Sequence, residues 1–502
     1  MNSPNTREKN NEKTWLGHPF GLSVLFNAEL WERFSFYGMR ALLVLYMVNE
    51  MKYDTSLGYA IYGAYTSLVY AFPVIGGWIA NKWLGYTRSI ILGGVLMALG
   101  HFMLAIPSEF TFFGALALLC VGNGFFKPNI SSTVGRLYSE EDTRRERGFY
   151  IFYMGINFGA FFSPLICGYL GENIDWHYGF GAAGIGMCYG LVRYVRGLRH
   201  IADHGTPPDP ERLQRKTAIG LSTEHLLYCG AFLVVPVAAL GLWQPAVSQT
   251  IIQGVSIAVI GVLISMAIRL QGVQRLRICA LMILMVFHMS WWAGFEQAGS
   301  SFNVMTDKHI DRHIFGIEIP ASVFQSVNAF FVITMIPIFT RLWKVLDRYK
   351  RNPSIPIKFS LALILVAAGF WVLNLGIAQA DENGIVALHW MILCYALHTM
   401  GELCLSPVGL SAVTLLVPKK WVGFGMGAWF LTISNGHIFA AVIAKMTSTG
   451  GDASQSDETL SHTVALAQYT EVFNTVVVFM VGAGVLLIVL SPFINRLMGG
   501  VR

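Results

Sequence analysis

Charged residues are scarce in this sequence. Of its 502 residues only 13% are Asp, Glu, Lys or Arg, against about 25% in a soluble domain. Hydrophobic residues make up 54% of the chain, and the mean hydropathy is +0.53. This composition excludes an ordinary soluble protein and predicts an all-α protein whose helices cross a membrane several times. The net charge of +6 is small; we attribute it to cytoplasmic loops rather than to a nucleic-acid-binding surface.

Recognisable metal-binding and processing motifs are also absent. No two of the seven cysteines have the spacing of a zinc site, and all lie in apolar runs, so we expect small core residues. No span contains a paired His/Asp metal motif, which argues against an intramembrane enzyme and predicts that the protein carries no metal or cofactor. The first 18 residues are polar and lack a cleavage site, so we expect a cytoplasmic tail rather than a signal peptide.

Apolar runs of about 20 residues or more recur along the chain, separated by short polar loops. We expect about fourteen spans. They are placed near 19–50, 56–81, 88–106, 110–135, 147–170, 179–197, 224–243, 249–269, 277–304, 321–346, 357–379, 387–417, 423–446 and 468–495.

Successive loops alternate in positive charge. The basic set contains Lys82 and Arg88, then Arg136, Arg144, Arg145 and Arg147, then residues 193–216, Arg269, Arg275 and Arg277, residues 341–358, and Lys419 and Lys420. The opposite set contains only Lys52, Lys308 and Arg312. The positive-inside rule places the first set, and with it both termini, in the cytoplasm.

The spans fall into two halves of six helices with an additional helical hairpin between them. The expected segments are a tail (1–18), an N-terminal bundle (19–197), a basic cytoplasmic linker (198–222), an inserted hairpin (223–270), a C-terminal bundle (271–495) and a short tail (496–502). Weak similarity between the halves predicts a transporter whose site lies at their interface.

The first span carries a stripe of ionisable and polar residues. At about 100° per residue, Glu29, Glu32, Arg33, Tyr37 and Arg40 share an arc of roughly 140°. Each ionisable group at the centre of a membrane helix costs roughly 2.5–3.5 kcal/mol on insertion scales. The stripe should therefore face the bundle interior or water. The alternative is internal pairing alone, such as Glu29 with Arg33 one turn away.

Two further spans of the first half carry isolated polar residues. Lys127 precedes Pro128, which predicts an opened helix backbone, and Lys127 is the natural partner for a carboxylate on the first span. The alternative is a lysine that extends toward the membrane surface. Asn157 on the fifth span could either bind a ligand or form a hydrogen bond between helices.

The second half carries acids without an obvious partner in the sequence. Glu296 follows Trp292 and Phe295 in a polar patch, and Glu402 precedes Pro407, which should break the tenth span. Cations in one half and acids in the other would suit a zwitterion, with carboxylate bound to Arg or Lys and ammonium bound to Glu. Carboxylates in excess of this need could carry protons, as in a symporter.

Three motifs resemble signatures of the proton-dependent oligopeptide transporter family, a branch of the major facilitator superfamily. They are Glu29-x-x-Glu32-Arg33-Phe34-x-x-Tyr37-Gly38 on the first span, Phe152-Tyr153-x-x-Ile156-Asn157-x-Gly159 on the fifth and Gly401-Glu402-x-x-x-Ser406-Pro407-x-Gly409 on the tenth. The resemblance covers nearly the whole chain. It implies the two-bundle fold with the two extra helices of bacterial members, and protons as the coupling ion.

The resemblance also implies roles for individual residues. Proton coupling would involve Glu29, Glu32, Arg33, Lys127 and Glu296. The peptide carboxylate would bind Arg33, Arg40, Lys127 and Tyr37, and the amino end Asn157, Asn328 and Glu402. Side-chain pockets would be lined by Tyr37, Tyr70, Tyr153, Trp292, Phe295, Ser406 and Trp429. Arg40 and Glu296 would form a gate pair on the periplasmic side. Trp429 could instead belong to an interfacial tryptophan belt.

The chain departs from the family pattern at three positions. Phe36 replaces a usual tyrosine on the binding face, and Asn81 replaces a usual aspartate after the second span, which would loosen a cytoplasmic conformational lock. Gly63 occupies the place of a histidine in animal relatives, so proton coupling here would depend on carboxylates.

These observations together predict a proton-driven importer of di- and tripeptides in the bacterial inner membrane, working by alternating access. Its partners would be the peptide, protons and lipid. The open alternative is another zwitterionic or anionic substrate, such as a peptide-like drug or nitrate. A channel or receptor, and an intramembrane enzyme, are the competing classes.

Overall fold

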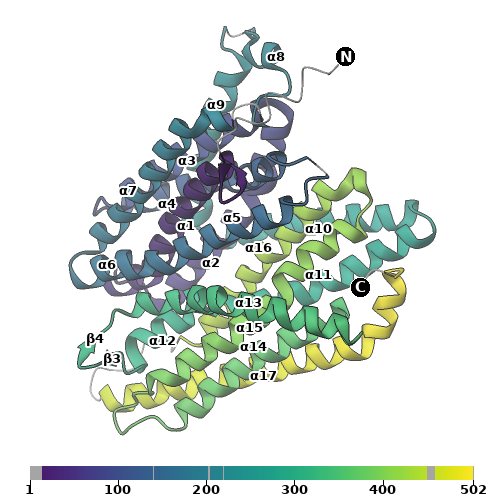
Figure 1. The fold of residues 1–502 in the computed structure, drawn as a ribbon. Coiled ribbons are helices and arrows are strands. Elements are labelled where there is room, and N and C mark those ends of the chain that lie inside the picture. Colours follow the sequence, from purple (N-terminus) through teal and green to yellow (C-terminus); the bar gives the residue numbers. More distant parts are fainter. Residues whose placement is uncertain (1–13, 140, 202–203, 219, 449–457, 501–502) are drawn as a thin grey trace. The chain divides into compact units, whose positions relative to one another are not determined.

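The computed structural model of the chain is almost entirely α-helical (Figure 1). The structure describes residues 14–139, 141–201, 204–218, 220–448 and 458–500. Within these residues the strands are two short antiparallel hairpins. They pair β1 (Thr14–Trp15) with β2 (His18–Pro19), and β3 (His313–Ile314) with β4 (Ile317–Glu318). The all-α class predicted from the sequence is confirmed.

The chain divides into two compact units, and the first two helices contribute to both. Unit 1 contains Met1–Met39 and Phe72–Leu240, and unit 2 contains Arg40–Ala71 and Gly241–Arg502. The end of α1 and most of α2 therefore pack with the C-terminal helices rather than with the rest of the N-terminal ones.

The helices lie close to the predicted spans. Those wholly or partly in unit 1 are α1 (Gly21–Leu45), α2 (Thr55–Ile79), α3 (Gly85–Leu104), α4 (Glu109–Arg136), α5 (Arg145–Ser163), α6 (Tyr169–Asn173), α7 (Trp176–Gly197), α8 (Pro210–Gln214) and α9 (Thr223–Trp243). Those wholly in unit 2 are α10 (Pro245–Arg269), α11 (Gly272–Phe295), α12 (Ser301–His309), α13 (Ser326–Arg348), α14 (Ile355–Ile377), α15 (Leu388–Leu416), α16 (Val422–Met446) and α17 (Glu458–Leu497). Short π-helical or 3₁₀ turns extend or join several of them, at Tyr46–Glu50, Ala80–Leu84, Pro164–Gly168, Glu296–Gly299 and Ala321–Gln325.

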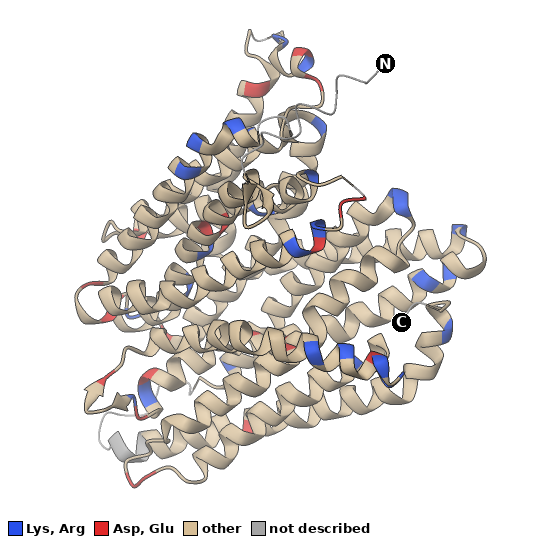
Figure 2. Cartoon of the chain, viewed as in Figure 1, with Lys and Arg blue, Asp and Glu red and all other residues tan. Residues whose placement is uncertain are grey.

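Eleven helical stretches of the described residues are long and apolar enough to cross a membrane. One of them, Thr55–Leu104, contains both α2 and α3. Helices α1 and α7 are not among the eleven, and for α1 the charged stripe is the reason. Figure 2 shows that the helix lengths are mostly free of charge, while Lys, Arg, Asp and Glu gather toward helix ends and loops.

The predicted break of the tenth span at Pro407 is wrong, and α4 behaves in the same way at Pro128. Helix α4 continues through Pro128, and α15 continues through Pro407. A proline removes one backbone hydrogen bond, but contacts from neighbouring helices can compensate for the loss. In α4 the carbonyl four residues before the proline belongs to Gly124, and a Cβ at Gly76 of α2 would lie 2.1 Å from that oxygen. Close packing of α2 therefore covers the site of the missing bond.

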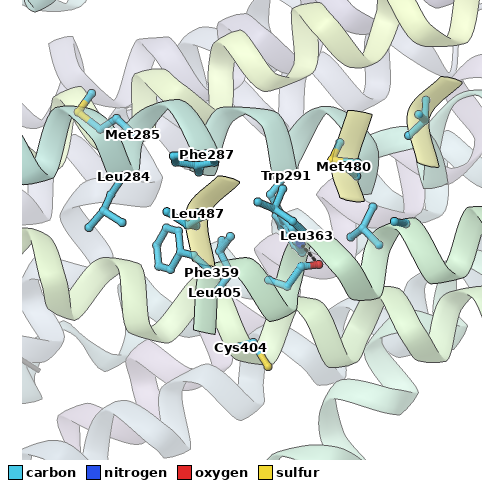
Figure 3. Packing of buried hydrophobic residues seen from close by; sticks show 14 of the residues in the cluster. Leu284, Met285, Phe287, Trp291, Phe359, Leu363, Cys404, Leu405, Met480 and Leu487 are labelled. Carbon is cyan, nitrogen blue, oxygen red and sulfur yellow. Dashed lines mark hydrogen bonds between the residues drawn. The ribbon is translucent and has the colours of Figure 1, made fainter. Parts of the chain in front are cut away.

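Packing within each unit depends on a few extensive helix contacts. In unit 1, α3 packs along α4 and α7; in unit 2, α14 packs along α15 and α17, and α11 along α16. Figure 3 shows the apolar centre of unit 2, where the indole N–H of Trp291 donates to the Ala362 carbonyl at 3.2 Å. The prediction that every cysteine lies in a core is wrong for Cys229, which is exposed on α9.

Candidate functional site

The four charged residues of the α1 stripe are all buried. Glu29 and Glu32 are 0% exposed, Arg33 is 5% exposed and Arg40 7%. Ionised groups at such depth require partners, because the cost of removing them from water is not otherwise recovered. The structure supplies these partners in two separate clusters, one in unit 1 and one in unit 2.

The unit 1 cluster is centred on Arg33. Its guanidinium forms a two-pronged ion pair with Glu32, from Nε and from Nη2, and Nη2 also donates to Asn123 Oδ1 of α4 at 3.1 Å. Planar pairing of this kind is the strongest geometry available to an arginine and a carboxylate. The Nε atom lies 3.7 Å from Glu29 Oε1, so the internal pair considered from the sequence is also present.

Lys127 of α4 completes this cluster. Its ammonium forms an ion pair with Glu29 Oε1, as its position in the sequence indicated. Two carboxylates and two cations thus share one buried site, while the second oxygen of Glu29 has no hydrogen-bond partner among the described residues. The Lys127 side chain is 28% exposed. The cluster thus pairs two carboxylates with two cations, of which Lys127 remains partly accessible.

Aromatic rings of α1 lie beside this cluster. The Arg33 guanidinium carbon lies 4.8 Å from the ring centroid of Phe36 and 5.8 Å from that of Tyr37. Phe36 is itself 2% exposed. The Phe36 ring therefore makes a cation–π contact with Arg33 and is not open to solvent. We therefore expect the missing tyrosine hydroxyl at this position to have a smaller effect on substrate binding.

Helix α5 approaches α1 at backbone contact because of its glycines. A Cβ at Gly159 would lie 2.4 Å from the Leu30 carbonyl oxygen and 2.9 Å from Arg33 Cβ. The glycine of the Asn157-x-Gly159 motif therefore lets α5 press against the charged part of α1. Asn157 itself is buried and donates to the Tyr153 carbonyl of its own helix at 2.9 Å.

The unit 2 cluster is centred on Arg40. Its Nη2 forms an ion pair with Glu296 Oε2, and its Nε donates to the Tyr62 hydroxyl of α2 at 2.7 Å. Glu296 is 2% exposed and begins the 3₁₀ turn that follows α11. The structure thus brings together the predicted gate pair. Tyr62 was not predicted, because nothing in its sequence context separates it from other buried tyrosines.

A second acid of unit 2 is held by an amide. Asn328 of α13 donates through Nδ2 to Glu402 Oε2 at 3.1 Å and to Thr399 Oγ1 at 2.9 Å. Both Asn328 and Glu402 are partly exposed. Ser406, one turn after Glu402, has a buried hydroxyl without a hydrogen-bond partner in the described part of the chain. These groups can accept from an ammonium ion.

Two predicted aromatic residues of unit 2, Trp292 and Trp429, are held in place by His288, which was not predicted from the sequence. The indole N–H of Trp292 donates to His288 Nε2 at 2.9 Å, so Nδ1 carries the proton and faces Thr432 Oγ1 at 2.6 Å. The imidazole also stacks on Trp429 with centroids 4.0 Å apart. Trp429 is 1% exposed, which fits packing inside unit 2 rather than an interfacial belt.

Two other predicted aromatic residues of unit 2 also stack on neighbouring rings. Phe295 stacks on Trp291, with centroids 4.6 Å apart, and Tyr70 stacks on His437 at 5.1 Å. Asn81, the replaced aspartate, accepts from the Tyr86 hydroxyl at 2.7 Å and remains part of a local hydrogen-bond network. No group of three or more His, Cys, Asp or Glu residues in the described ranges could hold a metal ion.

The fold and the clusters together define a polytopic helical membrane protein with paired charges buried among its helices. Residues 87–460 match the sequence profile described as the POT family. The chain therefore belongs to the POT family, whose members are transporters and not enzymes.

Individual relatives are similar over nearly the full length. An uncharacterized transporter, YclF, of Bacillus subtilis (strain 168) is 36% identical, with 98% of this chain and 97% of the relative covered. A di-/tripeptide transporter of Lactococcus lactis subsp. lactis (strain IL1403) is 34% identical, with 98% and 99% covered. The crystal structure of a peptide transporter POT in complex with sulfate is 33% identical, with a TM-score of 0.83 and 97% and 98% covered.

Proposed function

We propose that this protein imports di- and tripeptides together with protons, by alternating access. The observation that carries the proposal is the division of buried charge: an arginine–lysine–carboxylate cluster in unit 1 and an amide-held acid in unit 2. The full-length similarity to a relative named as a di-/tripeptide transporter supports it.

The two ends of a peptide require opposite partners. Arg33, Arg40 and Lys127, with Tyr37, would bind the carboxylate, because each of the three cations can exchange one carboxylate partner for another. Glu402 and Asn328, with Asn157, would bind the ammonium group. Tyr37, Tyr70, Tyr153, Trp292, Phe295, Ser406 and Trp429 would line the pockets for the side chains, whose aromatic surface tolerates varied residues.

Proton coupling would follow from the same ion pairs. A proton that binds Glu29 or Glu32 removes one negative charge from the unit 1 cluster, which leaves Arg33 or Lys127 available for the peptide carboxylate. A proton that binds Glu296 likewise weakens its pair with Arg40. In each case the proton adds to a carboxylate oxygen, and no other bond is formed or broken. Substrate and proton would then be favoured in the same state.

The helices and relatives indicate the membrane, and the loop charges indicate how the chain is oriented in it. Membrane-spanning helices and the bacterial relatives support an inner-membrane protein. We propose that both termini face the cytoplasm, that residues 19–197 and 271–495 act as two six-helix bundles, and that residues 223–270 form an inserted hairpin between them. The linker 198–222 would be cytoplasmic.

Uptake into proteoliposomes tests the proposed function. We expect dialanine to accumulate above its external concentration only when the outside is more acidic than the inside. This accumulation should be lost when a protonophore is added. Competition by unlabelled dialanine, nitrate and single amino acids identifies the substrate class. Uphill uptake that does not depend on the proton gradient would contradict the proposed proton coupling. Competition by nitrate but not by dialanine or amino acids would show that the substrate is an anion rather than a peptide. Single-channel currents would instead indicate a pore.

A further inference from the structure

His437 of α16 is a buried titratable group that the proposed transport steps do not use. It is 1% exposed, and neither ring nitrogen has a hydrogen-bond partner among the described residues. Buried polar groups are nearly always satisfied, and the exceptions require an explanation. His288 on α11 shows the ordinary case, because both of its ring nitrogens are hydrogen-bonded.

The unpaired imidazole faces the Arg40–Glu296 pair. Its Nδ1 lies 3.8 Å from Glu296 Oε2, the same oxygen that accepts from Arg40. This separation is about 1 Å beyond a hydrogen bond, so a small rotation of either side chain would close it. The histidine is thus positioned to compete with Arg40 for one carboxylate oxygen.

Helix α2 and the 3₁₀ turn after α11 enclose the imidazole. Tyr70 stacks on its ring with an interplanar angle of 27°. A Cβ at Gly63 would lie 3.3 Å from the His437 carbonyl oxygen, so α2 packs against α16 at backbone contact here. Gln297 Nε2 donates to the Ala440 carbonyl at 3.0 Å and ties the turn to α16. Bulk water is therefore kept from the pair.

The titratable groups around His437 are few. The charged residues of the described chain that act on it are Glu296 from the turn and Arg40 from α1. Helix α2 adds two tyrosine hydroxyls, that of Tyr62, which accepts from Arg40, and that of Tyr70. Helix α15 adds Tyr395, which interacts electrostatically with Arg40. An added proton on the imidazole would consequently act on the Arg40–Glu296 pair above all.

We propose that His437 is a further proton-binding residue of the transport cycle, which takes up a proton and passes it to Glu296 so that Arg40 is released. In the transfer the Nδ1–H bond breaks, an O–H bond forms on Glu296 Oε2, and the imidazole becomes neutral again. Glu296 is then uncharged, and Arg40 has lost its counter-ion. This inference rests on the proposed proton coupling and adds a residue to it.

The test compares His437→Gln with His101→Gln. Glutamine keeps the polarity and approximate size of histidine but binds no proton near neutral pH. His101 on α3 is a matched control: it is 0% exposed, and neither ring nitrogen has a partner in the described part of unit 1. His437→Asn provides a second variant should His437→Gln fail to fold.

Two transport measurements are made on each variant. Counterflow exchange of labelled dialanine needs no net proton movement, and we expect His437→Gln to retain it within about twofold, which also shows that the protein is folded. Proton-driven uptake, measured between about pH 5 and 8, should fall roughly tenfold or more with an altered pH profile. His101→Gln should match the wild type in both. The double variant His437→Gln/Glu296→Gln should be no worse than Glu296→Gln alone.

Each outcome decides between the two proposals. A wild type with proton-driven uptake and an unchanged pH profile in His437→Gln overturns the role of His437 alone. Additive losses in the double variant also overturn it. A wild type in which an inward proton gradient drives no peptide uptake overturns the proposed function and this inference together.

Discussion

At the scale of the residue, the chain uses acids in two different environments. Glu32 lies in a buried two-pronged pair with Arg33, whereas Glu402 is partly exposed and held by the amide of Asn328. The first environment suits a group that exchanges a proton against a fixed cation. The second suits a group that keeps one side open for a cationic ligand. Neutralising Glu32 and neutralising Glu402 should therefore impair different steps of transport.

Replacing Glu32 by Gln should separate exchange from uphill transport. Glutamine can still contact Arg33 but cannot bind and release a proton, so uphill uptake should be abolished while counterflow exchange persists. Uptake and counterflow in proteoliposomes measure the two. Glu224→Gln is the control, because Glu224 also pairs with an arginine of unit 1, Arg88 Nε at 2.8 Å, but at the more exposed start of α9. Loss of exchange together with uptake would assign Glu32 a structural role.

Replacing Glu402 by Gln should weaken peptide binding. A hydrogen bond to a charged group contributes about 1.5–3 kcal/mol, so we expect the affinity for dialanine to fall roughly tenfold to a hundredfold. Binding in detergent measures this directly. N-acetyl-dialanine, which lacks the ammonium group, is the matched ligand and should bind both proteins equally. An equal loss for both ligands would place Glu402 outside the amino-end site.

At the scale of the element, glycines decide how closely the helices of unit 1 approach one another. The predicted span of α5 located the helix, but the sequence did not reveal that its glycine faces a carbonyl of α1. The predicted break at Pro407 was wrong for a related reason. The local sequence shows only that a hydrogen bond is lost, while the packing of other helices decides whether the helix continues.

Replacing Gly159 by Ala should push α5 away from α1. The added Cβ would meet the Leu30 carbonyl at 2.4 Å, and backbone cannot yield as a flexible side chain can. Overpacking of this kind costs about 1–3 kcal/mol, so the unfolding midpoint in detergent should fall. Gly261→Ala on α10 is the control, because a Cβ there meets nothing within 4 Å. That change should be neutral or stabilise by about 0.5–1 kcal/mol. Equal midpoints for both variants would contradict the close contact.

At the scale of the whole molecule, composition and periodicity were sufficient for the all-α membrane class and the positions of the spans. The charged stripe of α1 was visible because charge is rare in apolar sequence. Lys127 could be assigned to a carboxylate for the same reason. Tyr62, His288 and His437 were not found, because a tyrosine or histidine in an apolar run has the same sequence pattern whether it packs in a core or serves a site. Only the tertiary contacts separate these cases.

The division of the chain into units bears on transport itself. Residues 40–71 of α1 and α2 pack with the C-terminal helices in unit 2. The contact includes reciprocal hydrogen bonds between two buried serines: Ser67 Oγ donates to the Ser434 carbonyl at 2.9 Å, and Ser434 Oγ to the Ser67 carbonyl at 2.8 Å. Alternating access, as proposed, requires segment 40–71 to part from α16 in each cycle. The two serines mark a place where the helices nearly touch.

Cysteines at both serine positions should therefore lock the transporter. In the variant Ser67→Cys/Ser434→Cys, an oxidant would join α2 to α16, because the two side chains already reach each other's backbone. We expect peptide uptake and counterflow to fall to background on oxidation and to recover on reduction. Each single variant, treated with the same oxidant, controls for the native cysteines. Full transport by a protein shown to be cross-linked would mean that segment 40–71 moves with unit 2 as one body, and the separation would have to occur elsewhere in the chain.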